Sequence, residues 1–110
     1  MNLLFICSKN QWRSPTAEQI WRRQPGFNVR SAGTSPAARH PVSSADLAWA
    51  DVIFAMVAME EKHKSRLLAE HRNKIAGKPI HVLDIPDDYR YMDPELVAQL
   101  QTSVAGILDL

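Results

Sequence analysis

The 110-residue sequence contains a single cysteine, Cys7, and this scarcity limits the chemistry available to the chain. One cysteine cannot form an internal disulfide or a multi-cysteine zinc site. It also cannot supply the second thiol that an intramolecular redox relay requires. Because a lone thiol suits a reducing compartment, we expect a cytoplasmic protein.

Net charge and long apolar runs are also scarce. The 13 basic and 12 acidic residues nearly balance, at a formal net charge of +1, whereas a nucleic-acid-binding domain usually shows a clear basic excess. No stretch approaches the roughly 20 apolar residues that cross a membrane. The apolar residues 1–6 are too short for a signal peptide and lack a basic region. We therefore expect no nucleic-acid partner, no membrane association, no metal and no other cofactor.

The order of apolar segments predicts one α/β domain spanning residues 1–110. Apolar residues make up 45% of the chain, enough for a core. Short apolar runs predict strands at residues 3–6, 27–32, 51–56 and 80–83. Amphipathic segments predict helices at residues 15–24, 43–49, 59–71 and from Asp93-Pro94 onward, with Ser14 as the N-cap of the first. This alternation indicates a three-layer sandwich, with a four-stranded parallel sheet and helices on both faces.

Residues 7–14 join the first predicted strand to the first predicted helix, and they carry the clearest chemical pattern. Backbone N–H groups and the helix dipole converge on an anion at such a junction, so we expect a bound phosphate or sulfate ion. Arg13 would grip two of its oxygens. The same positive field favours the thiolate form of Cys7, the form that attacks phosphorus, and Ser14 can donate its hydroxyl to it. The predicted phosphate-binding residues are Ser8, Lys9, Asn10, Gln11, Trp12, Arg13 and Ser14.

An ordinary buried cysteine at a strand end is the alternative interpretation of Cys7. The Cys-x5-Arg-Ser-Pro spacing favours the nucleophile, and it resembles the signature of the low-molecular-weight protein tyrosine phosphatases, Cys-x-Gly-Asn-x-Cys-Arg-Ser-Pro-x-Ala-Glu. The matching residues are Cys7, Asn10, Arg13, Ser14, Pro15, Ala17 and Glu18, and residues 29–34 and 50–56 are similar to two further family segments. Lys9 replaces the signature glycine, Trp12 replaces its second cysteine, and the middle of the chain is shorter than the family norm.

The resemblance implies a cysteine-dependent phosphomonoester hydrolase, a protein tyrosine phosphatase that forms a cysteinyl-phosphate. Its substrate would be a phosphorylated protein or a small aryl phosphate. The family takes its general acid from an Asp-Pro loop after the fourth strand, and Asp87 is our first choice in residues 84–94. Asp88 and Asp93 are the alternatives, although Asp93-Pro94 is also typical of a helix N-cap. Trp12, Tyr89 and Tyr91 are candidate walls of the substrate cleft, and His40 is interpreted as a free loop residue.

Two other functions compete with hydrolysis. A phosphate- or phosphopeptide-binding module without useful turnover is suggested by Lys9, by Trp12 and by the competing acid candidates. An arsenate reductase that consumes a small thiol such as glutathione is the second alternative. No oligomeric state is predicted.

Overall fold

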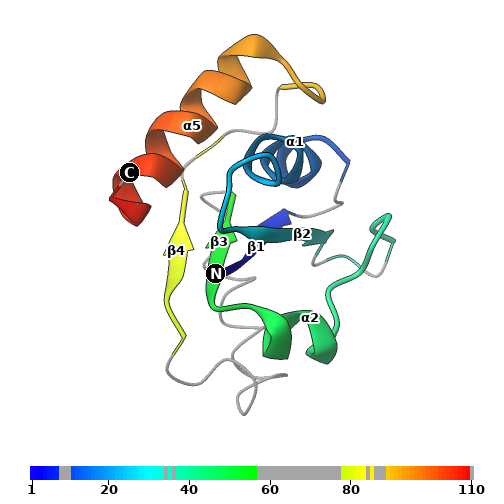
Figure 1. Ribbon diagram of the computed structural model, residues 1–110. Helices are drawn as coiled ribbons and strands as arrows, with labels where there is room; N and C mark the ends of the chain where they lie inside the picture. The colour runs from blue at the N-terminus through cyan, green and yellow to red at the C-terminus, as the bar shows by residue number, and fades with distance from the viewer. Residues whose placement is uncertain are drawn as a thin grey trace.

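A four-stranded parallel sheet lies at the centre of the computed structural model, which describes residues 1–7, 11–33, 35, 37–56, 78–83, 85 and 89–109 (Figure 1). Within those residues the strands are β1 (Asn2–Cys7), β2 (Asn28–Gly33), β3 (Val52–Ala55) and β4 (Ile80–Val82). Their order across the sheet is β2-β1-β3-β4, and every neighbouring pair is parallel. The predicted strands and the parallel sheet are confirmed, with ends within two residues of those expected from the apolar runs.

Helices cover both faces of the sheet, as the sequence predicted. The helix α1 (Arg13–Trp21) and the helix α5 (Pro94–Leu108) pack on one face, and the short helix α2 (Ser44–Trp49) packs on the other (Figure 1). After Asn2, the strand β1 is apolar and buried, as expected for a strand that is covered on both sides. Leu3 and Phe5 contribute to the core beneath α1 and α5, whereas Leu4 and Ile6 face α2.

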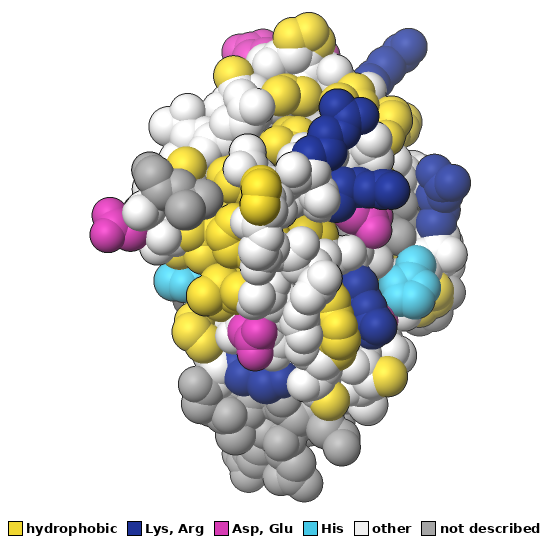
Figure 2. All heavy atoms as spheres, in the orientation of Figure 1, with side chains coloured by type: hydrophobic (Ala, Val, Ile, Leu, Met, Phe, Trp, Pro, Cys, Tyr) yellow, Lys and Arg dark blue, Asp and Glu magenta, His cyan; other side chains and the backbone are white. Residues whose placement is uncertain are grey.

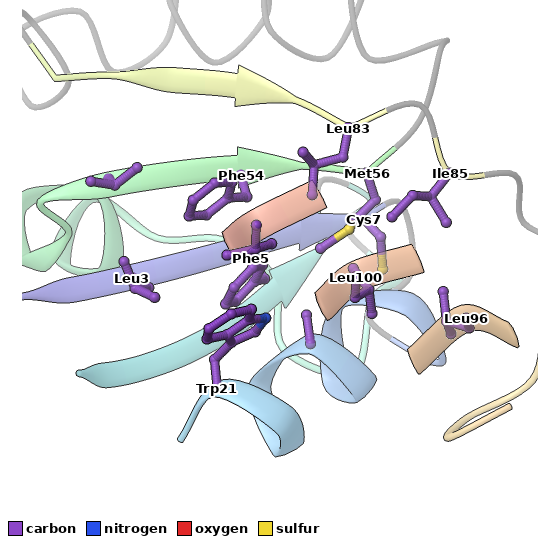
Figure 3. Packing of buried hydrophobic residues seen from close by; sticks show 13 residues of the cluster. Leu3, Phe5, Cys7, Trp21, Phe54, Met56, Leu83, Ile85, Leu96 and Leu100 are labelled. Carbon is purple, nitrogen blue, oxygen red and sulfur yellow. The ribbon is translucent and has the colours of Figure 1, made fainter. Parts of the chain in front are cut away.

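The larger core lies between the sheet and the pair α1 and α5. Phe5 and Phe54 stack there with ring centroids 5.1 Å apart, and Trp21 of α1 packs beside them (Figure 3). The buried side of α5 consists of Leu96, Leu100 and Val104. Each such side chain contributes about 1.5–3 kcal/mol on burial, so this contact fixes α1 and α5 on the same face of the sheet. Ile107, near the end of α5, is 38% exposed.

The helix ends test the predicted caps. Asp93 caps α5 by accepting a hydrogen bond from Glu95 N, with Pro94 at the first helical position, as predicted. Ser43 caps α2 in a capping box with Asp46. The prediction of Ser14 as N-cap of α1 is wrong: the helix begins at Arg13, its N-cap is Trp12, and Ser14 lies inside the first turn. The predicted helix at residues 59–71 lies outside the described residues.

The strand order determines where a ligand can meet the backbone. From β1 the chain moves to β2 on one side, and it then crosses back to β3 on the other side of β1. Parallel sheets of this kind bind ligands at such a switch point, beyond the carboxyl ends of the two central strands. Cys7 is the last residue of β1 and stands at that point. None of the helices in the described part of the chain is long and apolar enough to span a membrane.

Candidate active site

Cys7 lies at the carboxyl end of β1, beside the first turn of α1. Its side chain is buried, and its Sγ is 3.0 Å from Ser14 Oγ. Figure 3 shows the thiol at the end of the large core nearest Met56 and Leu100. Ser14 is fully buried, and its Oγ also lies 3.5 Å from the carbonyl oxygen of Ala32, near the end of β2. Ser14 therefore lies inside the first turn of α1, with its hydroxyl within reach of both the sulfur and that carbonyl oxygen, rather than at the cap position.

Arg13, a second predicted site residue, directly precedes Ser14 in the chain. It is the first residue of α1, and only 6% of it is exposed. Its Nη1 donates a hydrogen bond to the carbonyl oxygen of Ile85 at 3.2 Å. A buried guanidinium requires hydrogen-bond partners, and this bond ties Arg13 to the segment that follows β4. The cationic side chain and the helix N-terminus together favour an anion next to Cys7.

The other predicted site residues divide into three groups. Gln11 and Trp12 lead into α1 and line a surface cleft of about 610 Å³. Asp93 uses its carboxylate to cap α5. The remaining predicted phosphate-binding and acid residues, Ser8, Lys9, Asn10, Asp87 and Asp88, lie outside the described residues.

The cleft opens beside the residues that lead into α1. Trp12 is 45% exposed and Tyr91 is 49% exposed, and both line it, so two of the three predicted wall residues meet here. Tyr89 instead packs against the large core, and its hydroxyl accepts a hydrogen bond from Gln99 Nε2 at 2.8 Å. The described residues that line the cleft are Gln11, Trp12, Pro15, Glu18, Ser31, Arg39, His40 and Tyr91.

His40 differs from its predicted role as a free loop residue. Its Nε2 lies 2.9 Å from Asp46 Oδ2, and its ring forms part of the cleft wall. In the space-filling view, basic side chains gather near a histidine on the side where the β2–α2 connection runs (Figure 2). The pair of His40 and Asp46 was not predicted from the sequence. The spacing of Ser43 and Asp46, typical of a capping box, could have indicated a carboxylate held at this point.

Asp46 is buried at the start of α2 and receives several hydrogen bonds. Burial of the carboxyl acts to raise the pKa of Asp46, but hydrogen bonds from His40 and Ser43 outweigh it, so the pKa lies below the ordinary value of 3.8. Arg30 Nη1 adds an ion pair to Asp46 Oδ1 at 3.4 Å. The carboxylate therefore stays charged and anchors this side of the cleft. Among the described residues, no group of three or more His, Cys, Asp or Glu side chains gathers to hold a metal ion.

The comparisons with known proteins agree with this geometry. The family model described as low molecular weight phosphotyrosine protein phosphatase matches residues 2–54, from β1 through most of β3. The low-molecular-weight protein-tyrosine-phosphatase Etp of Escherichia coli K12 is 30% identical over an alignment of 118 positions, which spans 81% of this chain and 78% of Etp.

Solved structures share the fold at lower identity. The tyrosine phosphatase Wzb from Escherichia coli K30, in complex with phosphate, has a TM-score of 0.73 at 22% identity, covering 98% of this chain and 96% of Wzb. The YwlE arginine phosphatase from Geobacillus stearothermophilus has a TM-score of 0.59 at 21% identity, covering 98% of this chain and 88% of YwlE. The similarity to Etp extends over most of both chains, and the matched segment contains Cys7 and Arg13 at the spacing of the signature. This chain belongs to the low-molecular-weight protein tyrosine phosphatase family.

Proposed function

We propose that this protein is a cysteine-dependent phosphomonoester hydrolase, a protein tyrosine phosphatase that works through a cysteinyl-phosphate. The observation that carries the proposal is the position of Cys7 at the carboxyl end of the central strand, with Ser14 Oγ 3.0 Å from its Sγ and the N-terminus of α1 beside it. Family membership and the buried guanidinium of Arg13 add to it. The lone thiol favours a cytoplasmic location.

The proposed reaction has two steps. In the first, the thiolate of Cys7 attacks phosphorus, the S–P bond forms, the P–O ester bond breaks, and Asp87 gives a proton to the departing oxygen. In the second, Asp87 takes a proton from a water molecule that attacks phosphorus, and the S–P bond breaks to release phosphate and restore the thiolate. Asp88 and Asp93 are the alternative acids, and the cap that Asp93 makes on α5 favours Asp87 over it.

The phosphoryl group would be held by the backbone amides of residues 8–14 and by the guanidinium of Arg13. Phosphate and sulfate complexes of the structural relative Wzb support an oxyanion site of this kind. In another structural relative, YwlE, a cysteine-to-serine variant carries a phosphorylated active-site serine, which supports a covalent route.

The substrate we propose is phosphotyrosine in a protein, or a small aryl phosphate. Trp12 and Tyr91 line the cleft with both rings partly exposed, and aromatic rings offer offset-stacked or edge-on contacts to an aryl leaving group. Etp, the relative at 30% identity, is itself named a protein-tyrosine-phosphatase.

The decisive experiment compares the wild-type protein with Cys7→Ser on 4-nitrophenyl phosphate and phosphotyrosine. We expect the variant to lose turnover while it still binds inorganic phosphate, because the cradle is separate from the nucleophile. Asp87→Asn should slow a poor leaving group more than a good one, with Asp88→Asn as the matched control. Full turnover by Cys7→Ser would contradict the proposal. Phosphate binding without a burst of released nitrophenolate would favour the binding module instead, and arsenate-dependent consumption of glutathione would favour the reductase.

A further inference from the structure

Thr16 is a buried polar residue that has no role in the proposed two-step reaction. It lies in the first turn of α1, fully buried, at a position that the family signature leaves open. Its Oγ1 donates a hydrogen bond to the carbonyl oxygen of Trp12 at 2.6 Å. The same oxygen accepts a hydrogen bond from the backbone N–H of Met92 at 2.9 Å. One hydroxyl therefore joins the end of the phosphate-binding segment to a residue that is distant along the chain.

The backbone at Met92 is strained. Its φ angle is +60°, in the left-handed region that residues with a side chain seldom adopt, at a cost of about 1–2 kcal/mol. The neighbouring turn is closed by a hydrogen bond from Asp93 N to the carbonyl oxygen of Arg90 at 3.1 Å. A strained residue persists only where surrounding contacts hold it, and the bond to Thr16 is one of those contacts.

A second bond from α1 holds the other side of the same segment. Arg13 Nη1 donates to the carbonyl oxygen of Ile85, and Ile85 N donates to the carbonyl oxygen of Met56 at 2.9 Å. The first turn of α1 thus contacts the chain at Ile85 and again at Met92. Along the sequence, the two acid candidates Asp87 and Asp88 both fall between these two points.

We propose that Thr16 is a positioning residue, which holds Met92, close after the acid candidates in the chain, against the first turn of α1. The inference rests on the proposed function, in which one of those candidates protonates the leaving oxygen. A general acid must approach that oxygen to about 2.6–3.2 Å, and a misplacement of about 1 Å lowers a rate by about 100-fold. Through one atom, Thr16 Oγ1 bonds both to Trp12, in the phosphate-binding segment, and to Met92, which follows the acid candidates in the chain.

The test compares Thr16→Val, which keeps the shape and removes the hydroxyl, with Thr16→Ser, which keeps the hydroxyl. In Thr16→Val we expect kcat/KM to fall about tenfold for phenyl phosphate, a poor leaving group that needs the acid, and at most about threefold for 4-nitrophenyl phosphate. Inhibition by inorganic phosphate should stay within about twofold, since the cradle does not use the acid. Thr16→Ser should restore the phenyl phosphate rate. Thr102→Val, the same change on an exposed position of α5, should leave both rates unchanged.

Amide hydrogen exchange tests the bond without relying on activity. Loss of a typical hydrogen bond should speed the exchange of the Met92 N–H about fivefold to tenfold in Thr16→Val. The wild-type protein, Thr16→Ser and Thr102→Val should keep the slower rate.

Three results would overturn the inference. An unchanged Met92 exchange rate in Thr16→Val would show that the bond does not hold the turn. An equal fall in kcat/KM for phenyl phosphate and 4-nitrophenyl phosphate would show that the substitution damages the site in general. A phenyl phosphate rate that Thr16→Ser does not restore would show the same. If the wild-type protein lacked hydrolysis that depends on Cys7, the proposed function would fail and the catalytic part of the inference with it. In that case the exchange of Met92 would still decide whether Thr16 holds the segment.

Discussion

Replacing Ser14 with alanine should slow the breakdown of the cysteinyl-phosphate far more than its formation. The hydroxyl lies 3.0 Å from Cys7 Sγ and 3.5 Å from the carbonyl oxygen of Ala32, so it has two acceptors to choose between. Beside a neutral thiol, the hydroxyl can donate to Ala32. Beside a thiolate, it can turn and donate to the sulfur. Alanine keeps the shape of the site and removes this adjustable donor.

The expected size of the effect follows from the burial of Ser14. A hydrogen bond to a charged group contributes about 1.5–3 kcal/mol, and Ser14 is fully buried, so water cannot readily replace its hydroxyl. At about 1.36 kcal/mol for each factor of ten, the step in which the thiolate departs should slow by about 10- to 150-fold. Formation of the intermediate should change less. The thiolate is consumed in that step, and its loss of stabilisation is offset by its greater reactivity.

A rapid-mixing experiment with 4-nitrophenyl phosphate separates the two steps. Ser14→Ala should release about one equivalent of nitrophenolate in a burst and then continue at the lowered steady rate, because the intermediate accumulates. Ser103→Ala is a matched control, since it makes the same substitution on α5. A steady rate within about twofold of wild type would refute the reasoning, as would equal slowing of the burst and the steady phase.

Two further predictions concern stability and the acid. Asp46 has a pKa below 3.8, so its carboxylate stabilises the fold above that value and the contribution is lost as the pH falls through the folded pKa. Thermal unfolding of Asp46→Asn should therefore depend less on pH than that of wild type in the acid range, and parallel curves would contradict this. Asp93→Ala should lower the unfolding free energy by about 0.5–2 kcal/mol through the lost cap of α5, measured by urea denaturation. Its ratio of rates for phenyl and 4-nitrophenyl phosphate should stay at the wild-type value, and a changed ratio would identify Asp93 as the acid.

Most of the fold was predictable because burial on both faces of a parallel sheet leaves continuous apolar runs. Leu3, Leu4, Phe5 and Ile6 are all fully buried, and such a run has no polar alternation to obscure it. The capping signal at Asp93-Pro94 is equally local, and Asp93 caps α5 where that helix begins.

Local signals also explain what was correct and what was wrong at the site. The spacing of Cys7, Arg13 and Ser14 predicted a shared site where a strand is followed directly by a helix, and the structure brings Cys7 Sγ within 3.0 Å of Ser14 Oγ. The same local pattern favoured Ser14 as a helix cap. The helix instead begins at Arg13, which places Ser14 inside the first turn and beside the sulfur. His40 was misjudged for a related reason, since its partner Asp46 was not identified as a buried carboxylate.

The contacts of Arg13 and Thr16 are of a different kind, because they join residues 72 and 76 positions apart. No motif spans such distances, and the pairs meet only after α1 and α5 have packed on the same face of the sheet. Met92 directly precedes Asp93. The same turn therefore supplies the carboxylate that caps α5 and the backbone N–H that donates a hydrogen bond to Thr16 Oγ1. The packing of α5 therefore fixes both α5 itself and Met92, which follows the acid candidates in the chain. A family signature can specify the phosphate cradle, but the contact between Thr16 and Met92 is made by a hydroxyl at a position that the signature leaves open.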